Sequence, residues 1–120
     1  MILADTSVWI QHLREGRSRL ADALNDERVL IHPFVVGELA CGNLRNRSEV
    51  LALLGKLPAA PVATDAEALQ FIEDRRLMGV GLGYVDVHLL ASATLSTSAR
   101  LWTLDRKLAE AAAKLKVVYR

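Results

Sequence analysis

The chain contains a single cysteine, Cys41, among its 120 residues, so no disulfide can form within it. This scarcity fits a reducing compartment, and we expect the protein in the cytoplasm. Aromatic residues make up only 5% of the chain against 52% apolar residues, so the core must consist mainly of leucine, alanine and valine. At this length one domain over residues 1–120 can bury a core without metal or disulfide support.

Long apolar runs and a bias in charge are also absent. No apolar run reaches the roughly 18 residues that a membrane-spanning helix needs, so we expect no membrane span. The first residues lack the basic region that precedes the apolar part of a signal peptide, so we expect no secretory leader. The formal net charge of +1 gives no general support for a polyanion-binding protein, although a local basic patch remains compatible with it.

Short apolar segments that read as strands alternate with helical patterns along the chain, which predicts an α/β fold with a mainly parallel sheet. Right-handed crossovers place helices on both faces, giving three layers, α/β/α, around four to five short strands. Pro58 and Pro61 limit the third strand to an edge, because proline lacks an amide hydrogen. We expect strands near 1–4, 29–31, 57–62, 99–104 and 117–119, and helices near 6–15, 18–26, 33–41, 48–55, 64–77, 84–94 and 105–114.

Two aspartates each follow a predicted strand, Asp5 after the first and Asp105 after the segment 100–104. Either aspartate could simply cap the next helix, as could Thr6 or Ser7 after the first strand. If the two strands are neighbours, however, the carboxylates lie a few ångströms apart, because parallel strands are spaced by about 4.8 Å. Two such charges repel each other, and a cation would remove the conflict.

Two further acids stand among apolar residues. Glu38 lies within a predicted helix, and Asp86 begins another helix after a glycine-containing loop. No lysine or arginine lies within one helical turn of either acid, so no local ion pair accounts for them. A solvated face for Glu38 and a first-turn position for Asp86 are the alternatives to a functional role.

Four segments together resemble the PIN-domain ribonucleases, specifically the VapC-type toxins of bacterial toxin–antitoxin pairs. They are Leu3–Trp9, Val36–Leu39, Gly83–Ala91 and Leu101–Arg106, in an order that covers nearly the whole chain. The resemblance implies that Asp5, Glu38, Asp86 and Asp105 are the catalytic acids. It also implies RNA cleavage dependent on Mg²⁺ or Mn²⁺, inhibition by a cognate antitoxin, and a homodimer.

By the same resemblance, Asp5, Asp86 and Asp105 are expected to hold the metal, and Thr6, Ser7 and Thr103 to support them. Many relatives carry one more acid near the start of the last helix, where this chain has Arg106 and Lys107. Two other functions remain open: a non-catalytic module that binds RNA or protein, and an aspartyl phosphatase with Asp5 as nucleophile. The phosphatase usually needs a second acid two residues on, where this chain has Ser7.

Other candidate residues have weaker patterns. His88 is expected to be a packed or surface histidine, and His12 and His32 have no metal-ligand spacing with it. Cys41 is expected to be a small core residue. The glycines at 79, 81 and 83 lack the dinucleotide-binding pattern and predict a flexible connection. The arginines at 14, 17, 19, 45 and 47 are solvated by default, and contact with RNA phosphate is the alternative.

Overall fold

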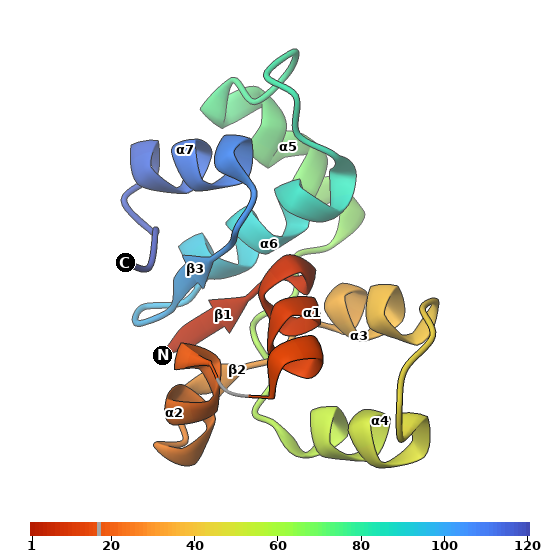
Figure 1. Cartoon of the computed structure of the whole chain (residues 1–120). Coiled ribbons are helices and arrows are strands. Elements are labelled where there is room, and N and C mark those ends of the chain that lie inside the picture. The colour runs from red at the N-terminus through yellow and green to blue at the C-terminus, as the bar shows by residue number, and fades with distance from the viewer. Residues whose placement is uncertain (17) are drawn as a thin grey trace.

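A computed structural model describes residues 1–16 and 18–120; Arg17, one of the arginines considered above, lies outside the described residues. In this part of the chain, none of the helices is long and apolar enough to cross a membrane. The described residues form three strands and seven helices (Figure 1). They are β1 (Ile2–Ala4), α1 (Thr6–Glu15), α2 (Arg19–Asn25), β2 (Val29–Leu30), α3 (Pro33–Ala40), α4 (Arg47–Lys56), α5 (Asp65–Arg75), α6 (Tyr84–Leu95), β3 (Arg100–Trp102) and α7 (Arg106–Lys114).

The sheet has the order β2-β1-β3, and both strand pairs are parallel. Ile2 pairs with Val29 on one side and with Arg100 on the other. This confirms the predicted α/β fold with a parallel sheet, and it makes β1 and β3 neighbours.

The sheet has fewer strands than the predicted four to five, since the described residues form three. The other two expected strands are reduced to single bridges, Ile31 with Ala59 and Leu101 with Val118, one at each edge. Around Ala59, Pro58 and Pro61 lack the amide hydrogens that a longer ladder requires. Around Val118, both ladder hydrogen bonds involve Leu101, which donates to Val117 and accepts from Tyr119.

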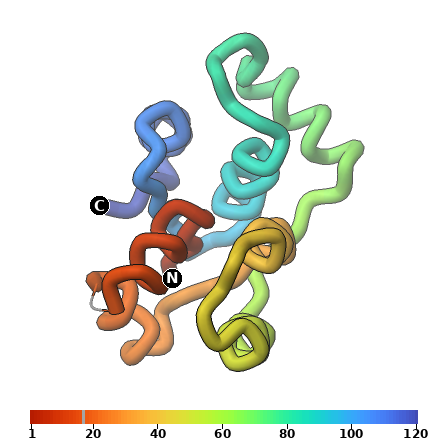
Figure 2. Tube along the Cα trace, turned by 45° about the vertical axis from the view of Figure 1, so that its right-hand side comes forward, coloured from red at the N-terminus to blue at the C-terminus, as the bar shows by residue number. Residues whose placement is uncertain are grey.

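Helices cover the sheet on both sides: α1 and α2 lie on one side, and α5 and α6 lie on the other (Figures 1 and 2). Strand β1 is therefore buried along its whole length, which explains its uninterrupted apolar sequence. Helix α6 is buried from Val87 to Ala93, so it packs as a core helix and not as a surface helix. Because all strands run parallel, their carboxyl ends open onto one edge of the sheet.

The helices that leave this edge begin at polar caps. The side chain of Asp5 accepts a hydrogen bond from the amide of Val8, and that of Asp105 accepts one from the amide of Leu108. Asp5 is therefore the N-cap of α1, which decides between it and the other two residues that could cap this helix, Thr6 and Ser7. An aspartate in this position also offsets the helix dipole. Both aspartates are thus helix caps, as one interpretation of the sequence proposed. Each capping bond uses only one lone pair, so the carboxylates can still accept other hydrogen bonds or bind a cation.

Candidate active site

Asp5 lies at the centre of the carboxyl edge and is buried. Its amide donates to the carbonyl of Trp102 at 2.9 Å, which continues the β1–β3 ladder and fixes the backbone. The hydroxyl of Ser7 donates to Oδ1 at 2.5 Å, and the hydroxyl of Thr103 donates to Oδ2 at 2.5 Å. Both carboxylate oxygens are therefore held in place by hydroxyl donors, one from α1 and one from the loop after β3.

Asp105 is tied to Asp5 through Thr103. The amide of Asp105 donates to the Thr103 hydroxyl at 3.0 Å, and that hydroxyl in turn donates to Asp5. The amide of Leu104 donates to the Ser7 hydroxyl at 3.0 Å, which adds a second link between the two strand ends. These contacts span nearly the full chain length, so the two aspartates keep a fixed relative position.

Glu38 reaches the same edge from α3. The hydroxyl of Thr6 donates to its Oε1 at 2.5 Å, so the residue next to Asp5 holds the carboxylate of Glu38. Glu38 is solvent-exposed, which agrees with the solvated face considered from the sequence. Its hydrogen bond to α1 nevertheless holds the exposed carboxylate beside the residue that follows Asp5.

Asp86 is the third residue of α6 and is half-buried. Its Oδ2 accepts a hydrogen bond from the amide of Gly83 at 3.0 Å. Burial raises the pKa of Asp86, the bond from Gly83 partly opposes this rise, and the charges of Asp105, Asp5 and Glu38 raise the pKa further. The charges of Asp5, Glu38 and Asp105 therefore lie close enough to act on the carboxyl group of Asp86.

No basic group neutralises this cluster: within the described residues, none of the four acids forms an ion pair with lysine, arginine or histidine. Nor do three acidic, histidine or cysteine side chains in this part of the chain already have the geometry of a metal site. The donors still suit Mg²⁺ or Mn²⁺, since Mg²⁺ binds through one or two carboxylates and keeps several water ligands. The four carboxylates have no cationic partner, and the pKa of Asp86 is raised. A bound cation would neutralise their negative charge and favour the ionised form of Asp86.

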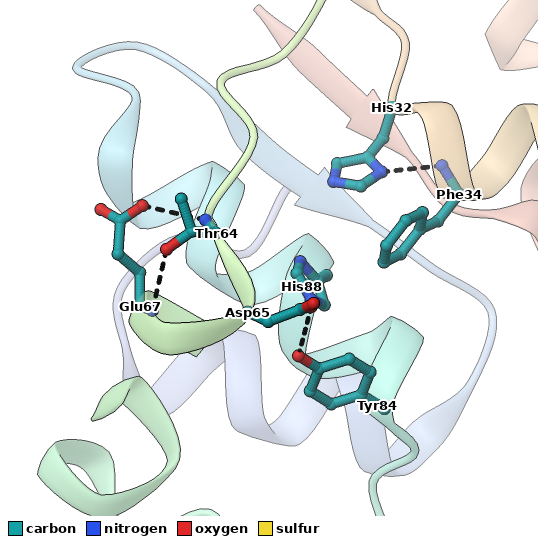
Figure 3. Close-up of polar contacts among 7 residues, drawn as sticks. All are labelled: His32, Phe34, Thr64, Asp65, Glu67, Tyr84 and His88. Atoms are coloured by element: carbon teal, nitrogen blue, oxygen red, sulfur yellow. Dashed lines mark hydrogen bonds and ion pairs between the residues drawn. The ribbon is translucent and has the colours of Figure 1, made fainter. Parts of the chain in front are cut away.

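A cluster of aromatic and histidine rings joins the helices that carry Glu38 and Asp86 (Figure 3). The ring of His88 packs against Phe34 at 4.6 Å and against Tyr84 at 4.7 Å between centroids. The Nδ1 atom of His32 accepts from the amide of Phe34 at 3.0 Å, which makes His32 the N-cap of α3. Asp65 accepts from the Tyr84 hydroxyl at 2.8 Å and lies 3.6 Å from Nε2 of His88. His88 is thus a packed histidine, as expected.

Sequence reasoning missed this cluster, although it considered His88 and His32 separately. Only the position of His32 could have been predicted from its neighbours in sequence, because it directly precedes Pro33 at the start of a helix and so occupies a capping position. The contacts of His32 with His88 join positions 56 residues apart, with ring centroids separated by 6.2 Å. Cys41 is exposed at the end of α3, so its expected place in the core is wrong. The turn of α3 that precedes it directs Leu39 inward instead.

Comparison with protein families agrees with this architecture. The PIN domain family profile matches residues 2–114. The chain therefore belongs to the PIN-domain family, as the four acidic segments predicted.

Within this family the chain is similar to the VapC-type ribonucleases. Ribonuclease VapC32 of Mycobacterium tuberculosis, from strains CDC 1551 / Oshkosh and ATCC 25618 / H37Rv, is 49% identical over 114 residues. The alignment covers 95% of this chain and 92% of the relative. The crystal structure of PAE2754 from Pyrobaculum aerophilum matches with a TM-score of 0.61 and 19% identity, over 92% of this chain and 84% of that one. At that identity the structural match supports the fold alone.

Proposed function

We propose that this protein is a VapC-type endoribonuclease that uses Mg²⁺ or Mn²⁺ and the carboxylates of Asp5, Glu38, Asp86 and Asp105. Family membership and the 49% identity to a ribonuclease favour a nuclease. The observation that carries the proposal is the gathering of four acids without a basic partner, in which three of them raise the pKa of the fourth. A carboxylate cluster of this kind suits a hydrolase that holds a hard cation against a phosphodiester.

In this mechanism Asp5, Asp86 and Asp105 would hold the cation, with Asp5 as the central residue of the three. Glu38 would either bind the cation directly or orient the water that attacks the phosphate. Ser7 and Thr103 fix both oxygens of Asp5, and Thr6 directs Glu38. When bound, a divalent cation lowers the pKa of its water and neutralises charge on the phosphate. Attack by water leaves a 5′-phosphate and a 3′-hydroxyl.

The experiment that tests the proposal is cleavage of total or transfer RNA by the purified protein with Mg²⁺, with Mn²⁺ and with EDTA. We expect cleavage with either metal, none with EDTA, and 5′-phosphate ends that a phosphate-dependent 5′-exonuclease can degrade. Cleavage that persists in EDTA and leaves 2′,3′-cyclic phosphates contradicts metal-assisted hydrolysis. RNA binding without cleavage at any metal concentration supports the alternative, a non-catalytic RNA-binding module.

We also propose that a cognate antitoxin inhibits the enzyme by inserting a basic side chain among the acids. A groove of about 540 Å³ runs from the exposed side chains of Ile10 and Leu13 on α1 to Glu38 on α3. An antitoxin segment can bury apolar side chains in this groove and reach the acids at its end with an arginine. The planar guanidinium pairs with a carboxylate through two hydrogen bonds.

Two matched variants test the groove. Ile10→Asp places a charge in the groove, and Leu69→Asp places the same charge on an exposed leucine of α5. We expect Ile10→Asp to lose the complex with the protein encoded by the neighbouring gene and Leu69→Asp to retain it. A tight complex that leaves RNA cleavage intact contradicts inhibition at the acids.

A further inference from the structure

A second charged region lies beside the acids, on the side where the end of α5 faces α7 (Figure 1). A pocket of about 190 Å³ is lined there by Arg75 and Arg76 from the end of α5 and by Lys107 and Lys114 from α7. All four side chains are exposed. We call these four residues the basic pocket.

The charges of the basic pocket are not neutralised within the protein. Among the described residues, none of the four cations forms an ion pair with a carboxylate. The pocket also contains one acid, Glu110, but Glu110 is paired with Arg106 at 3.1 Å. Four unpaired positive charges in a chain of net charge +1 therefore form a local concentration of charge. Such a concentration attracts polyanions and raises their rate of association.

The basic pocket is continuous with the acidic cluster through Lys107. Lys107 follows Asp105 by two residues, and its side chain crosses the backbone of Gly81, where an added methyl group would lie 2.7 Å from Cδ and Nζ. Gly81 precedes Gly83, whose amide holds Asp86. The side chain of Lys107 therefore packs against the loop that positions Asp86, and it also lines the basic pocket.

The two lysines can follow an extended strand. Lys107 and Lys114 are seven residues apart on α7, so they lie on the same face and are separated by roughly 10 Å along the helix axis. This separation exceeds the 3.4 Å rise per charge along one strand of a duplex, so the lysines can contact different phosphates of one strand. Arg75 and Arg76 add contacts on the opposite wall, since arginine binds phosphate through two parallel hydrogen bonds.

We propose that the basic pocket binds the phosphate backbone of the RNA substrate beyond the scissile bond, so that the strand runs from the acids across Lys107 toward α5. This inference rests on the proposed ribonuclease function. The pocket binds RNA without reading its sequence, because phosphate contacts carry no base information. It therefore contributes affinity and strand direction, whereas the choice of cleavage sequence belongs to other contacts.

The test measures binding of a labelled single-stranded oligoribonucleotide in EDTA, where cleavage does not contribute. The triple variant Arg76→Gln, Lys107→Gln, Lys114→Gln is compared with Arg28→Gln, Lys56→Gln, Arg100→Gln. The control also removes three positive charges, but from residues outside the pocket. Two of them, Arg28 and Arg100, lie at the amino-terminal edge of the sheet. We expect the slope of log affinity against log salt to fall by about 2 in the triple variant, at about 0.7 per phosphate contact on a single strand, and to stay nearly unchanged in the control.

Cleavage at saturating metal gives a second readout. The triple variant should raise KM at least tenfold with little change in kcat, because the acids remain intact. Equal salt slopes and equal affinities in the two triple variants overturn the proposal. RNA binding that matches the control, together with loss of binding to an acidic partner protein, assigns the pocket to a protein and also overturns it.

A third variant separates binding from folding. Arg76 adopts a left-handed backbone conformation with φ 53°, which asparagine tolerates better than arginine. Arg76→Asn should therefore keep or raise the melting temperature while weakening RNA binding in EDTA. Unchanged RNA binding in this variant contradicts a contact between Arg76 and the RNA. Normal cleavage in Asp5→Asn contradicts the nuclease mechanism alone, whereas equal salt slopes in the two triple variants contradict the role of the basic pocket alone.

Discussion

At the scale of single residues, three of the four acids of the candidate site have a structural role as well as their proposed catalytic one. Asp5 and Asp105 cap helices, and Asp86 accepts from the amide of Gly83. A substitution that keeps the structural role and removes the charge can therefore separate the two. Asparagine does this, because its side-chain oxygen still accepts the capping hydrogen bond.

Asp5→Asn should lower the rate of RNA cleavage by orders of magnitude while the protein stays folded. An amide is a much poorer ligand for Mg²⁺ than a carboxylate, and the loss of one negative charge relieves repulsion among the acids. Cleavage at saturating Mg²⁺ and thermal unfolding with and without Mg²⁺ measure the two effects. Asp22→Asn, an exposed first-turn aspartate of α2, is the matched control. Near-normal cleavage by the Asp5 variant would exclude Asp5 from the catalytic set.

Thr103→Val should lower the free energy of unfolding by about 1–2 kcal/mol, because it removes the donor to Asp5 and the acceptor for the amide of Asp105. It should also raise the Mg²⁺ concentration needed for half-maximal cleavage, since Asp5 then loses one of its two hydroxyl donors. Urea denaturation and a metal titration measure these changes. Thr103→Ser keeps the hydroxyl and should restore both properties. Equal stability of the valine and serine variants argues against this bridge.

At the scale of elements, His32 connects the stability of α3 to pH. Burial, and to a lesser extent the charge of His88, lower the pKa of His32 to about 4. His88 and Phe34 pack against the His32 ring, and Asp65 and Tyr84 reach the far side of His88. Between about pH 4 and 6.5 the unfolded chain binds a proton at His32 that the folded protein does not bind. Stability therefore rises with pH between about 4 and 6.5 and is lost on acidification through this range.

We expect the free energy of unfolding to fall by up to about 3 kcal/mol between pH 6.5 and pH 4, at about 1.36 kcal/mol for each pKa unit. Burial also lowers the pKa of His12, which adds to the effect with the same sign. Urea denaturation at intervals across this range measures the slope. His32→Asn retains an acceptor for the amide of Phe34 and cannot titrate, so its slope should be smaller. An unchanged slope assigns the pH dependence to other groups.

At the scale of the whole molecule, we expect a homodimer. The expectation comes from the family resemblance, and exposed apolar side chains such as Leu53 and Leu95 could be buried in an apolar interface between two copies. Sedimentation velocity should give twice the 13.2 kDa mass of one chain at micromolar concentration. A monomer over the whole micromolar range contradicts the expectation.

The charge distribution also belongs to this scale. An unpaired acidic cluster and an unpaired basic pocket lie side by side, while the chain as a whole is nearly neutral. The net charge therefore conceals two regions of opposite sign, and a polyanion is repelled by one and attracted by the other. A divalent cation at the acids would remove the repulsion and leave the basic pocket to attract the strand.

The sequence by itself determined the alternation of strands and helices, the parallel sheet and the positions of the four acids along the chain. These features are local: continuous apolar runs indicate buried strands, and periodic apolar residues with polar caps indicate helices. The same local reasoning placed Asp5 and Asp105 at the ends of strands. It failed at Ala59 and Val118, where the length of a strand depends on how its neighbour pairs.

Only the tertiary structure decided which side chains meet. The hydroxyl of Thr103 reaches Asp5 across 98 positions of sequence, and Arg76 faces Lys107 and Lys114 across a pocket between α5 and α7. No local periodicity encodes such contacts, because they depend on how the crossovers place one helix against another. Strand order fixed the first contact, since β3 lies beside β1. The placement of α7 against the loop at Gly81 and opposite the end of α5 fixed the second.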